Sequence, residues 1–183
     1  MRICIFGAAN EQIDRSYKEA AFEVGRQPGK AGIPLVFGGG GEGMMGACAR
    51  GTHAEGGFVT GIVPEFFTNG VDEVLYEECD EVIYTPDLHT RIQRMNEMSD
   101  GFIVLPGGVG TLEEFFDILA ANCLHRIHKF LAVFNIDGYY DPQIAMLQRA
   151  VDQGFMFPER MEQFRAFREN QIPEMIEYIR NFK

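Results

Sequence analysis

The sequence has no uninterrupted apolar run near the roughly 18 residues that a membrane-spanning helix needs. Its first apolar stretch, residues 3–6, is too short for a signal peptide and runs directly into Gly7. The four cysteines, at positions 4, 48, 79 and 123, form no C-x-x-C pair. We therefore expect a chain with no membrane association, with reduced thiols and a cytoplasmic location.

Basic residues are scarce. Lysine and arginine number 16 against 27 acidic residues, which gives a formal charge of −11, and the only lysines are Lys18, Lys30, Lys129 and Lys183. Nucleic acids and anionic membranes bind non-specifically to basic surfaces, so this composition argues against both as partners. It leaves room for a small anionic ligand, because a few local donors can outweigh a distant negative field.

Several catalytic motifs are also missing. No G-K-[ST] ends a glycine-rich loop, and there is no G-x-S-x-G or H-E-x-x-H. These absences exclude a Walker A loop, a hydrolase nucleophile elbow and a zinc-protease helix. Cys123, His125 and His128 lie close together, but no fourth ligand has a sensible spacing, so we expect no metal.

The 183 residues, 46% of them hydrophobic, have the size of one domain spanning 1–183. Short apolar runs predict strands at 2–6, 34–37, 58–63, 81–85, 101–105 and 130–135. Helical patterns alternate with them at 14–31, 43–55, 88–98, 111–125, 142–154 and 173–182. This alternation predicts an α/β fold with a doubly wound, Rossmann-like parallel sheet. Such sheets bind ligands beyond the carboxyl ends of their strands.

The segment 105–114 reads Leu-Pro-Gly-Gly-Val-Gly-Thr-Leu-Glu-Glu, so glycines turn the chain from a predicted strand into a predicted helix. Glycine leaves backbone N–H groups uncovered, and the helix start adds unpaired N–H groups and the positive end of a dipole. Together they predict an anion site suited to phosphate. The alternative is a tight turn followed by a capping box, with Thr111 as N-cap and Glu114 at the third helical position.

A second glycine-rich stretch, 38–46, follows the second predicted strand and contains a G-x-G-x-x-G at 41, 43 and 46. Glu65 follows about twenty residues later, as in a dinucleotide-binding fingerprint. The stretch equally fits close packing of a helix on a sheet. A hydride-transfer enzyme also needs a substrate region, for which the chain leaves little room. We favour a second wall of the same ligand pocket.

Two arginines lie in the first two turns of the predicted helix at 88–98. Arg91 and Arg94 lie one helical turn apart, so both can face one side. Arginine binds phosphate and carboxylate in a bidentate manner. The alternative is an ordinary solvated helix face.

Residues 106–114 resemble the P-G-G-x-G-T-x-x-E signature of the lonely guy family. That family includes cytokinin riboside 5′-monophosphate phosphoribohydrolases and was long described as possible lysine decarboxylases. The resemblance covers almost the whole chain and includes His-x-Arg at 89–91 and Asp-Gly-Tyr-Tyr-Asp-Pro at 137–142. It implies hydrolysis of the N-glycosidic bond of a nucleoside 5′-monophosphate, AMP or an N6-modified AMP, by a homodimer.

The resemblance also implies roles for individual residues. Arg91 and Glu114 match the functional arginine and glutamate, and Glu73 more loosely matches an acidic residue that contacts the substrate. Ile92 stands where the family usually has lysine. The full set expected to bind substrate is Gly39, Gly40, Glu73, Arg94, Gly107, Gly108, Val109, Gly110, Thr111 and Glu113.

Cleavage of an N-ribosyl bond passes through an oxocarbenium-like sugar, so we expect Glu114 to stabilise positive charge or activate water. No metal or organic cofactor is needed. Lysine decarboxylation is disfavoured, because it normally uses pyridoxal phosphate on a lysine and no predicted ligand-edge loop contains one. Two other classes stay open: a non-catalytic nucleotide or cofactor carrier on the same fold, and a dinucleotide-dependent oxidoreductase.

A homodimer is also favoured by apolar residues on the predicted helix at 111–125, which follows the glycines at 107–110. These residues are Phe115, Phe116, Leu119 and Leu124. A soluble monomer that exposed all of them would carry an unusually large apolar patch.

Overall fold

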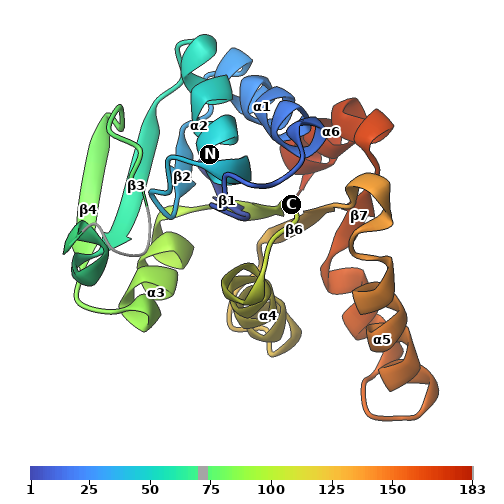
Figure 1. The fold of residues 1–183 in the computed structure, drawn as a ribbon. Helices are drawn as coiled ribbons and strands as arrows, with labels where there is room; N and C mark the ends of the chain where they lie inside the picture. Colours follow the sequence, from blue (N-terminus) through green and yellow to red (C-terminus); the bar gives the residue numbers. More distant parts are fainter. Residues whose placement is uncertain (70–73, 183) are drawn as a thin grey trace.

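The structure is a computed structural model that describes residues 1–69 and 74–182. In these residues seven strands form one parallel sheet (Figure 1). The strands are β1 (Ile3–Phe6), β2 (Leu35–Phe37), β3 (Val59–Pro64), β4 (Glu81–Thr85), β5 (Gly101–Val104), β6 (Phe130–Phe134) and β7 (Arg165–Phe167). Their order across the sheet is β4-β3-β2-β1-β5-β6-β7. The predicted doubly wound parallel sheet is therefore confirmed.

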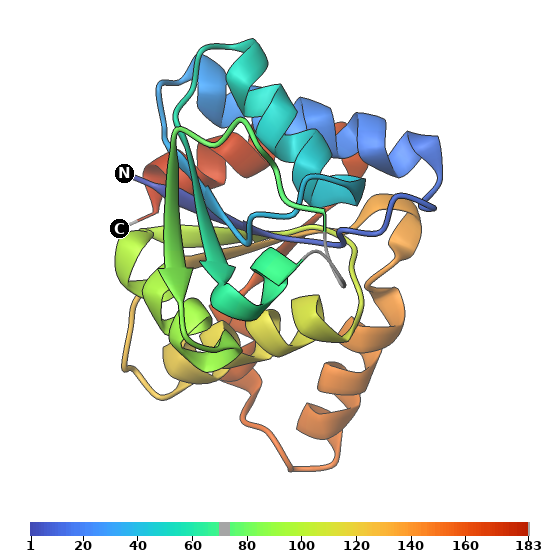
Figure 2. The same cartoon turned by 60° about the vertical axis from the view of Figure 1, so that its left-hand side comes forward.

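Helices cover both faces of this sheet. The α-helices are α1 (Arg15–Lys30), α2 (Gly43–Ala54), α3 (Leu88–Met98), α4 (Val109–Cys123), α5 (Asp141–Asp152) and α6 (Ile172–Asn181). Short 3₁₀ helices are η1 (Glu65–Asn69), η2 (Ile136–Gly138), η3 (Pro158–Gln163) and η4 (Glu169–Gln171). Helices α1, α2 and α6 lie on one face, and α3, α4 and α5 on the other (Figures 1 and 2). No helix in the described ranges is long and apolar enough to span a bilayer.

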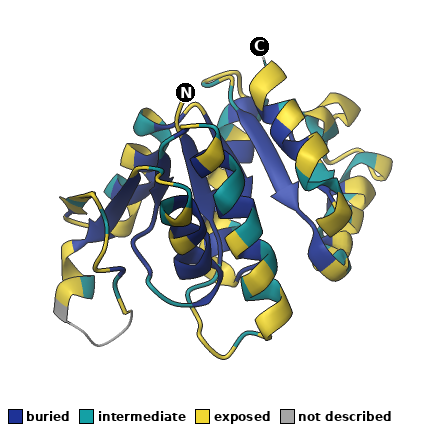
Figure 3. Ribbon diagram, turned by 90° about the horizontal axis from the view of Figure 1, so that it is seen from above, coloured by how far each residue is buried: buried dark blue, intermediate teal, exposed yellow. Residues whose placement is uncertain are grey.

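The side chains of β1 show how one central strand serves both layers. Ile3 and Ile5 belong to the core beneath α1, α2 and α6, whereas Cys4 and Phe6 belong to the core above α3 and α4. Successive side chains of a strand point to opposite faces, so a strand covered on both faces must be apolar throughout. Accordingly the five inner strands are buried throughout, whereas the edge strands β4 and β7 and the outer helix faces are partly exposed (Figure 3).

The direction of strand addition reverses between β1 and β5. From β1 the chain adds β2, β3 and β4 on one side, and β5, β6 and β7 on the other. The loops that leave β1 and β5 therefore diverge to opposite faces and open a crevice at the carboxyl edge. Helices α3 and α4 both begin at this edge, because each follows a strand directly.

The start of α4 differs from the capping-box alternative. The helix begins at Val109 with Gly108 as N-cap, and no side chain caps it. Thr111 is thus the third helical residue, and Glu114 lies in the second turn rather than the first. The capping box is wrong because Gly108 adopts the extended N-cap conformation three residues before Thr111.

The segment after α5 also differs from expectation, because the sequence predicted no strand there. The three-residue β7 pairs with β6, and the chain returns across α4 before it. Phe115 and Leu119, expected to face a second subunit, are buried within the chain. Phe164 packs edge-on against Phe115, with ring centroids 5.7 Å apart. Leu124 alone of the four residues named for a dimer stays largely exposed, at 65%.

Candidate active site

A cavity of about 370 Å³ lies at the carboxyl edge of the sheet, where β1 and β5 diverge. Three segments supply most of its wall: the loop after β1, the start of α3 and the start of α4. Its lining residues are Gly7, Ala8, Ala9, Asn10, Met45, Phe67, Leu88, Arg91, Ile92, Gly108, Gly110, Thr111, Glu113 and Glu114. The sheet topology therefore brings together residues separated by more than 100 positions in the sequence.

The start of α4 offers backbone donors to this cavity. The first N–H groups of any α-helix have no partner inside the helix, and here the N-cap is a glycine with no side chain to satisfy them. A Cβ added to Gly108 or Gly110 would meet nothing within 4 Å, so the missing side chains leave open space over these N–H groups. This geometry, with the positive end of the helix dipole, suits a phosphate.

The start of α2 is different, because its donors are already used. Gly43 N–H donates to Glu11 Oε2 at 3.2 Å, and the N–H groups of Met44 and Met45 donate to the Ala8 carbonyl at 2.9 and 3.2 Å. Gly46 packs against the Gly41 carbonyl, where a side chain would overlap. The G-x-G-x-x-G at 41–46 thus serves close packing, and its first-turn N–H groups are not available to a dinucleotide.

Arg91 reaches the cavity from the first part of α3. The carboxylate of Asp87 caps this helix by accepting from Thr90 N–H at 2.7 Å, which starts the helix immediately after β4. The side chain of Arg91 is buried, with Nη2 3.6 Å from Glu114 Oε1. Its guanidinium lies 6.0 Å from the centroid of the Phe67 ring and occupies the space that a side chain at Gly38 would fill.

One polar atom of Arg91 lacks a hydrogen-bond partner among the described residues. This atom is Nε, which is buried. An unpaired buried donor costs free energy, so such atoms call for an explanation beyond folding. Since Arg91 lines the cavity, a bound anion or heteroatom could accept from this group.

Glu114 lies one helical turn after Gly110 on the same face of α4. Side chains of a helix point back toward its N-terminus, so Glu114 reaches over Gly110, which has no side chain to obstruct it. The carboxylate is buried beside Arg91 and lines the cavity. Beneath this pair, burial raises the pKa of the Cys4 thiol, and the negative charge of Glu114 raises it further.

Comparison with known proteins identifies the family. Residues 45–178 match the family model described as "Possible lysine decarboxylase". The chain is 41% identical over 159 residues to a probable cytokinin riboside 5′-monophosphate phosphoribohydrolase of Oryza sativa subsp. japonica, an alignment that covers 86% of this chain and 63% of that one. The chain belongs to the lonely guy family. A cytokinin riboside 5′-monophosphate phosphoribohydrolase of Arabidopsis thaliana is 37% identical, over 86% of this chain and 71% of its own.

The chain spans less than two thirds of some of these lonely guy relatives, 63% and 64% of two rice proteins. Solved structures share the fold at lower identity. The molybdenum cofactor binding protein of Rippkaea orientalis has a TM-score of 0.66 at 19% identity, covering 98% of both chains. The Moco carrier protein of Chlamydomonas reinhardtii has a TM-score of 0.69 at 19% identity, covering 97% of this chain and 95% of that one.

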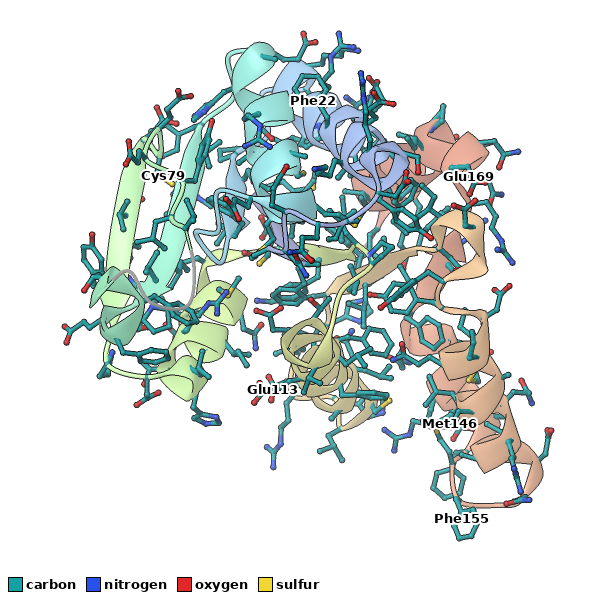
Figure 4. The ribbon with its side chains drawn as sticks, in the orientation of Figure 1. Phe22, Cys79, Glu113, Met146, Phe155 and Glu169 are labelled. Carbon is teal, nitrogen blue, oxygen red and sulfur yellow. The ribbon has the colours of Figure 1, made fainter. Side chains whose placement is uncertain are left out.

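The residues predicted from the lonely guy signature do not all reach the cavity. Gly108, Gly110, Thr111 and Glu113 line it together with Arg91 and Glu114, and Gly107 lies in the adjoining turn. Val109 is 84% exposed and faces outward. Glu113 lies at the rim and is labelled in Figure 4.

Three other predicted residues lie elsewhere. Arg94 is exposed and pairs with Glu97, 3.2 Å away, outside the cavity wall. Gly39 and Gly40 are buried: Gly39 lies against Val63, and Gly40 forms an antiparallel bridge with Leu75. Neither glycine lines the cavity, so the expected second wall comes from Met45 instead. Glu73 lies outside the described residues.

Several lining residues escaped the sequence analysis. Asn10 follows β1 at the switch point, and its position after the first strand could have indicated it. Leu88 and Phe67 carry no sequence signal for a site, since one is a helix-start apolar residue and the other lies in a 3₁₀ helix. Within the described ranges, no group of three or more His, Cys, Asp or Glu residues could hold a metal ion.

Proposed function

We propose that this protein hydrolyses the N-glycosidic bond of a nucleoside 5′-monophosphate, AMP or an N6-modified AMP, to the free base and ribose 5-phosphate. The observation that carries the proposal is the buried Arg91–Glu114 pair, 3.6 Å apart, in one cavity with the open start of α4. The names of the plant relatives support the same reaction.

The phosphate binds first in this account. N–H groups at Gly108–Thr111 donate to its oxygens, and the helix dipole favours its charge. Glu114 lies six residues beyond the N-cap, about 9 Å along the helix axis, and its side chain points back toward the phosphate. The ribose then lies between the phosphate and the carboxylate. Phosphate binding thus supplies the energy that orients the reacting carbon.

Glu114 acts on the anomeric carbon. As the bond from C1′ to the base nitrogen breaks, positive charge develops on the sugar, and a carboxylate close by stabilises it. The same carboxylate accepts a proton from the attacking water, whose oxygen bonds to C1′. The base nitrogen takes up a proton from solvent, and Glu114 later returns its proton to solvent, so the net reaction adds the elements of water across the bond.

Arg91 serves the leaving group and the nucleotide. A guanidinium stays charged at all accessible pH values, so it donates hydrogen bonds rather than acting as a proton source. We assign the donor that its Nε leaves unpaired among the described residues to the bound nucleotide. The ion pair with Glu114 also holds both side chains in place before substrate arrives.

Three other functions fit the site less well. A carrier needs the open helix start but has no use for a buried Arg91–Glu114 pair. A pyridoxal-dependent decarboxylase needs a lysine, and none of the described lysines, at positions 18, 30 and 129, lines the cavity. A dinucleotide-dependent oxidoreductase would need the N–H groups of α2, which Glu11 and Ala8 already occupy.

A homodimer in the cytoplasm completes the proposal. Its support is an exposed apolar surface along α4 and the segment after α5. Leu124, Phe155 and Phe157 are 65%, 83% and 66% exposed around an apolar groove of about 340 Å³. Phe155 lies at the far tip of this segment, away from the sheet (Figure 4). A second copy would cover this surface, and light scattering that gives a monomer mass would contradict it.

The reaction is tested by product analysis. Purified protein is incubated with a panel of nucleoside 5′-monophosphates and with the matching nucleosides, and free base, ribose 5-phosphate and inorganic phosphate are separated and quantified. We expect base and ribose 5-phosphate in equal amounts from AMP or an N6-modified AMP, with little base from the nucleoside. Equal rates with and without the 5′-phosphate would refute the role of the α4 start, and release of inorganic phosphate would indicate a nucleotidase.

A further inference from the structure

Tyr139 contacts the glycine turn that leads into α4. It lies in the loop after β6, the strand next to β5, so this loop runs beside the loop that follows β5. The Tyr139 hydroxyl donates a hydrogen bond to the Gly107 carbonyl at 2.8 Å. The two residues are 32 positions apart, and the sheet order alone makes them neighbours.

The Gly107 carbonyl belongs to the same planar peptide as the Gly108 N–H. In a trans peptide these two groups point in opposite directions. A bond that holds the carbonyl toward Tyr139 therefore turns the N–H away from it. Gly108 lines the cavity, and its N–H has no hydrogen-bond acceptor among residues 1–69 and 74–182.

The Gly107–Gly108 peptide has little intrinsic preference for one orientation of its plane. Glycine on both sides leaves its plane free to rotate, because no Cβ restricts the backbone at Gly107 or Gly108. We propose that Tyr139 is a positioning residue for the substrate phosphate, because its hydroxyl fixes the Gly107–Gly108 peptide with the Gly108 N–H facing the cavity. The inference rests on the proposed function and adds a residue outside the signature to its phosphate site.

Tyr139 is itself held in place. Its N–H donates to the Ile136 carbonyl at 3.0 Å, and its ring packs edge-on against Tyr140 with centroids 5.1 Å apart. The turn before it uses left-handed backbone at Asp137 and Gly138, with φ of 51° and 71°. A hydroxyl on such a fixed support can restrain a flexible peptide.

Tyr140 supplies a matched control in the same chain. Its hydroxyl donates to the Leu105 carbonyl at 2.7 Å, a bond of the same kind to the same turn. The residue that follows Leu105 is Pro106, which has no N–H. The Tyr140 bond therefore orients no donor, and its loss affects stability rather than phosphate binding.

The test compares Tyr139→Phe and Tyr140→Phe with the wild type. Calorimetry measures the Kd of ribose 5-phosphate, steady-state kinetics with AMP give kcat and KM, and thermal unfolding gives Tm. For Tyr139→Phe we expect about a threefold to tenfold weaker Kd and a similar rise in KM, the loss expected of one hydrogen bond, with kcat within twofold of wild type. For Tyr140→Phe we expect a lower Tm with Kd and KM unchanged.

Two results would overturn the inference. One is a Tyr139→Phe variant that binds ribose 5-phosphate as tightly as wild type. The other is an equal loss of affinity in both variants that follows their Tm values, which would mark Tyr139 as structural only. A wild type that fails to bind ribose 5-phosphate would instead refute the phosphate site of the proposed function, and this inference with it.

Discussion

Removal of the Arg91 side chain tests whether the buried ion pair is the working part of the cavity. The perturbation is Arg91→Ala, and Arg94→Ala is its matched control: the same residue type on the same helix, three positions later. Arg91 is buried 3.6 Å from Glu114, whereas Arg94 is about half exposed and 3.2 Å from Glu97. The two variants lose the same charge from very different surroundings.

The two variants should differ in the stability that they lose. At 3.6 Å the Arg91–Glu114 attraction is about 4–5 kcal/mol with an effective dielectric constant near 20, and breaking a buried pair costs about 3–5 kcal/mol. A chain of this size loses about 2–4 °C of Tm per kcal/mol, so Arg91→Ala should lower Tm by about 6–20 °C. An exposed pair such as Arg94–Glu97 contributes about 1 kcal/mol or less.

Catalysis separates the variants further. Removing one positioned electrostatic group typically costs about a hundredfold or more in kcat, and we expect that loss for Arg91→Ala with AMP. Arg91→Lys should keep the fold, because an ammonium still faces Glu114. It should also lose much of the activity, because a point charge cannot reproduce the planar fork or the Nε donor. Arg94→Ala should keep kcat within about twofold.

The assay is steady-state release of adenine from AMP, run below the Tm of the least stable variant, with unfolding followed in parallel. Arg91→Ala with near-wild-type kcat would remove Arg91 from the reaction and strengthen the carrier alternative. If Arg91→Ala and Arg94→Ala lost activity equally, the distinction drawn from their burial would be wrong.

Three further predictions follow from single residues. Gly110→Ala should raise Tm slightly in calorimetry, because alanine favours a helix by up to about 1 kcal/mol over glycine. It should also raise the KM for AMP in steady-state kinetics, because the added Cβ projects into the open space over the α4 start. Ile92→Lys should stay folded and lower the KM for AMP, since Ile92 lines the cavity and a lysine there would direct its ammonium toward the nucleotide. Hydrogen bonding from Asn135, then Arg168, lowers the pKa of Asp141, so the stability it contributes is present above pH about 4, the value of an unfolded aspartate, and is lost as pH falls below it. The free energy of unfolding, measured with denaturant at pH 7 and again below pH 4, should therefore fall less for Asp141→Asn than for the wild type.

Much of the fold was predictable because it follows from local pattern. The buried strands are continuous apolar runs, and the helix at 88–98 has the bounds that the sequence predicts, since Asp87 caps it. Strand β7 was missed because three residues, Arg-Ala-Phe, are too few to show a period. Its existence depends on pairing with β6, a contact that no local pattern encodes.

The candidate site was predictable where one segment makes it and less so where several do. The glycine turn before α4 was found from strand, glycine and helix alone. Which of Arg91 and Arg94 is buried could not be predicted from their spacing. Residues one turn apart lie on similar faces of a helix, and only the tertiary structure decides which of them is covered. The sequence likewise predicts Phe115 as an interface residue, whereas in the structure Phe164, from the segment after α5, packs against it.

The proposed function requires the buried carboxylate of Glu114, beside the open start of α4, for cleavage of the N-glycosidic bond. Its most direct test is the rate of adenine release from saturating AMP by Glu114→Gln, which keeps the shape of the side chain and removes its charge. We expect kcat to fall by about a hundredfold or more, with AMP still bound at close to the wild-type Kd by calorimetry. Turnover near the wild-type rate would contradict it, because the carboxylate would then be neither the base nor the stabiliser of the sugar cation.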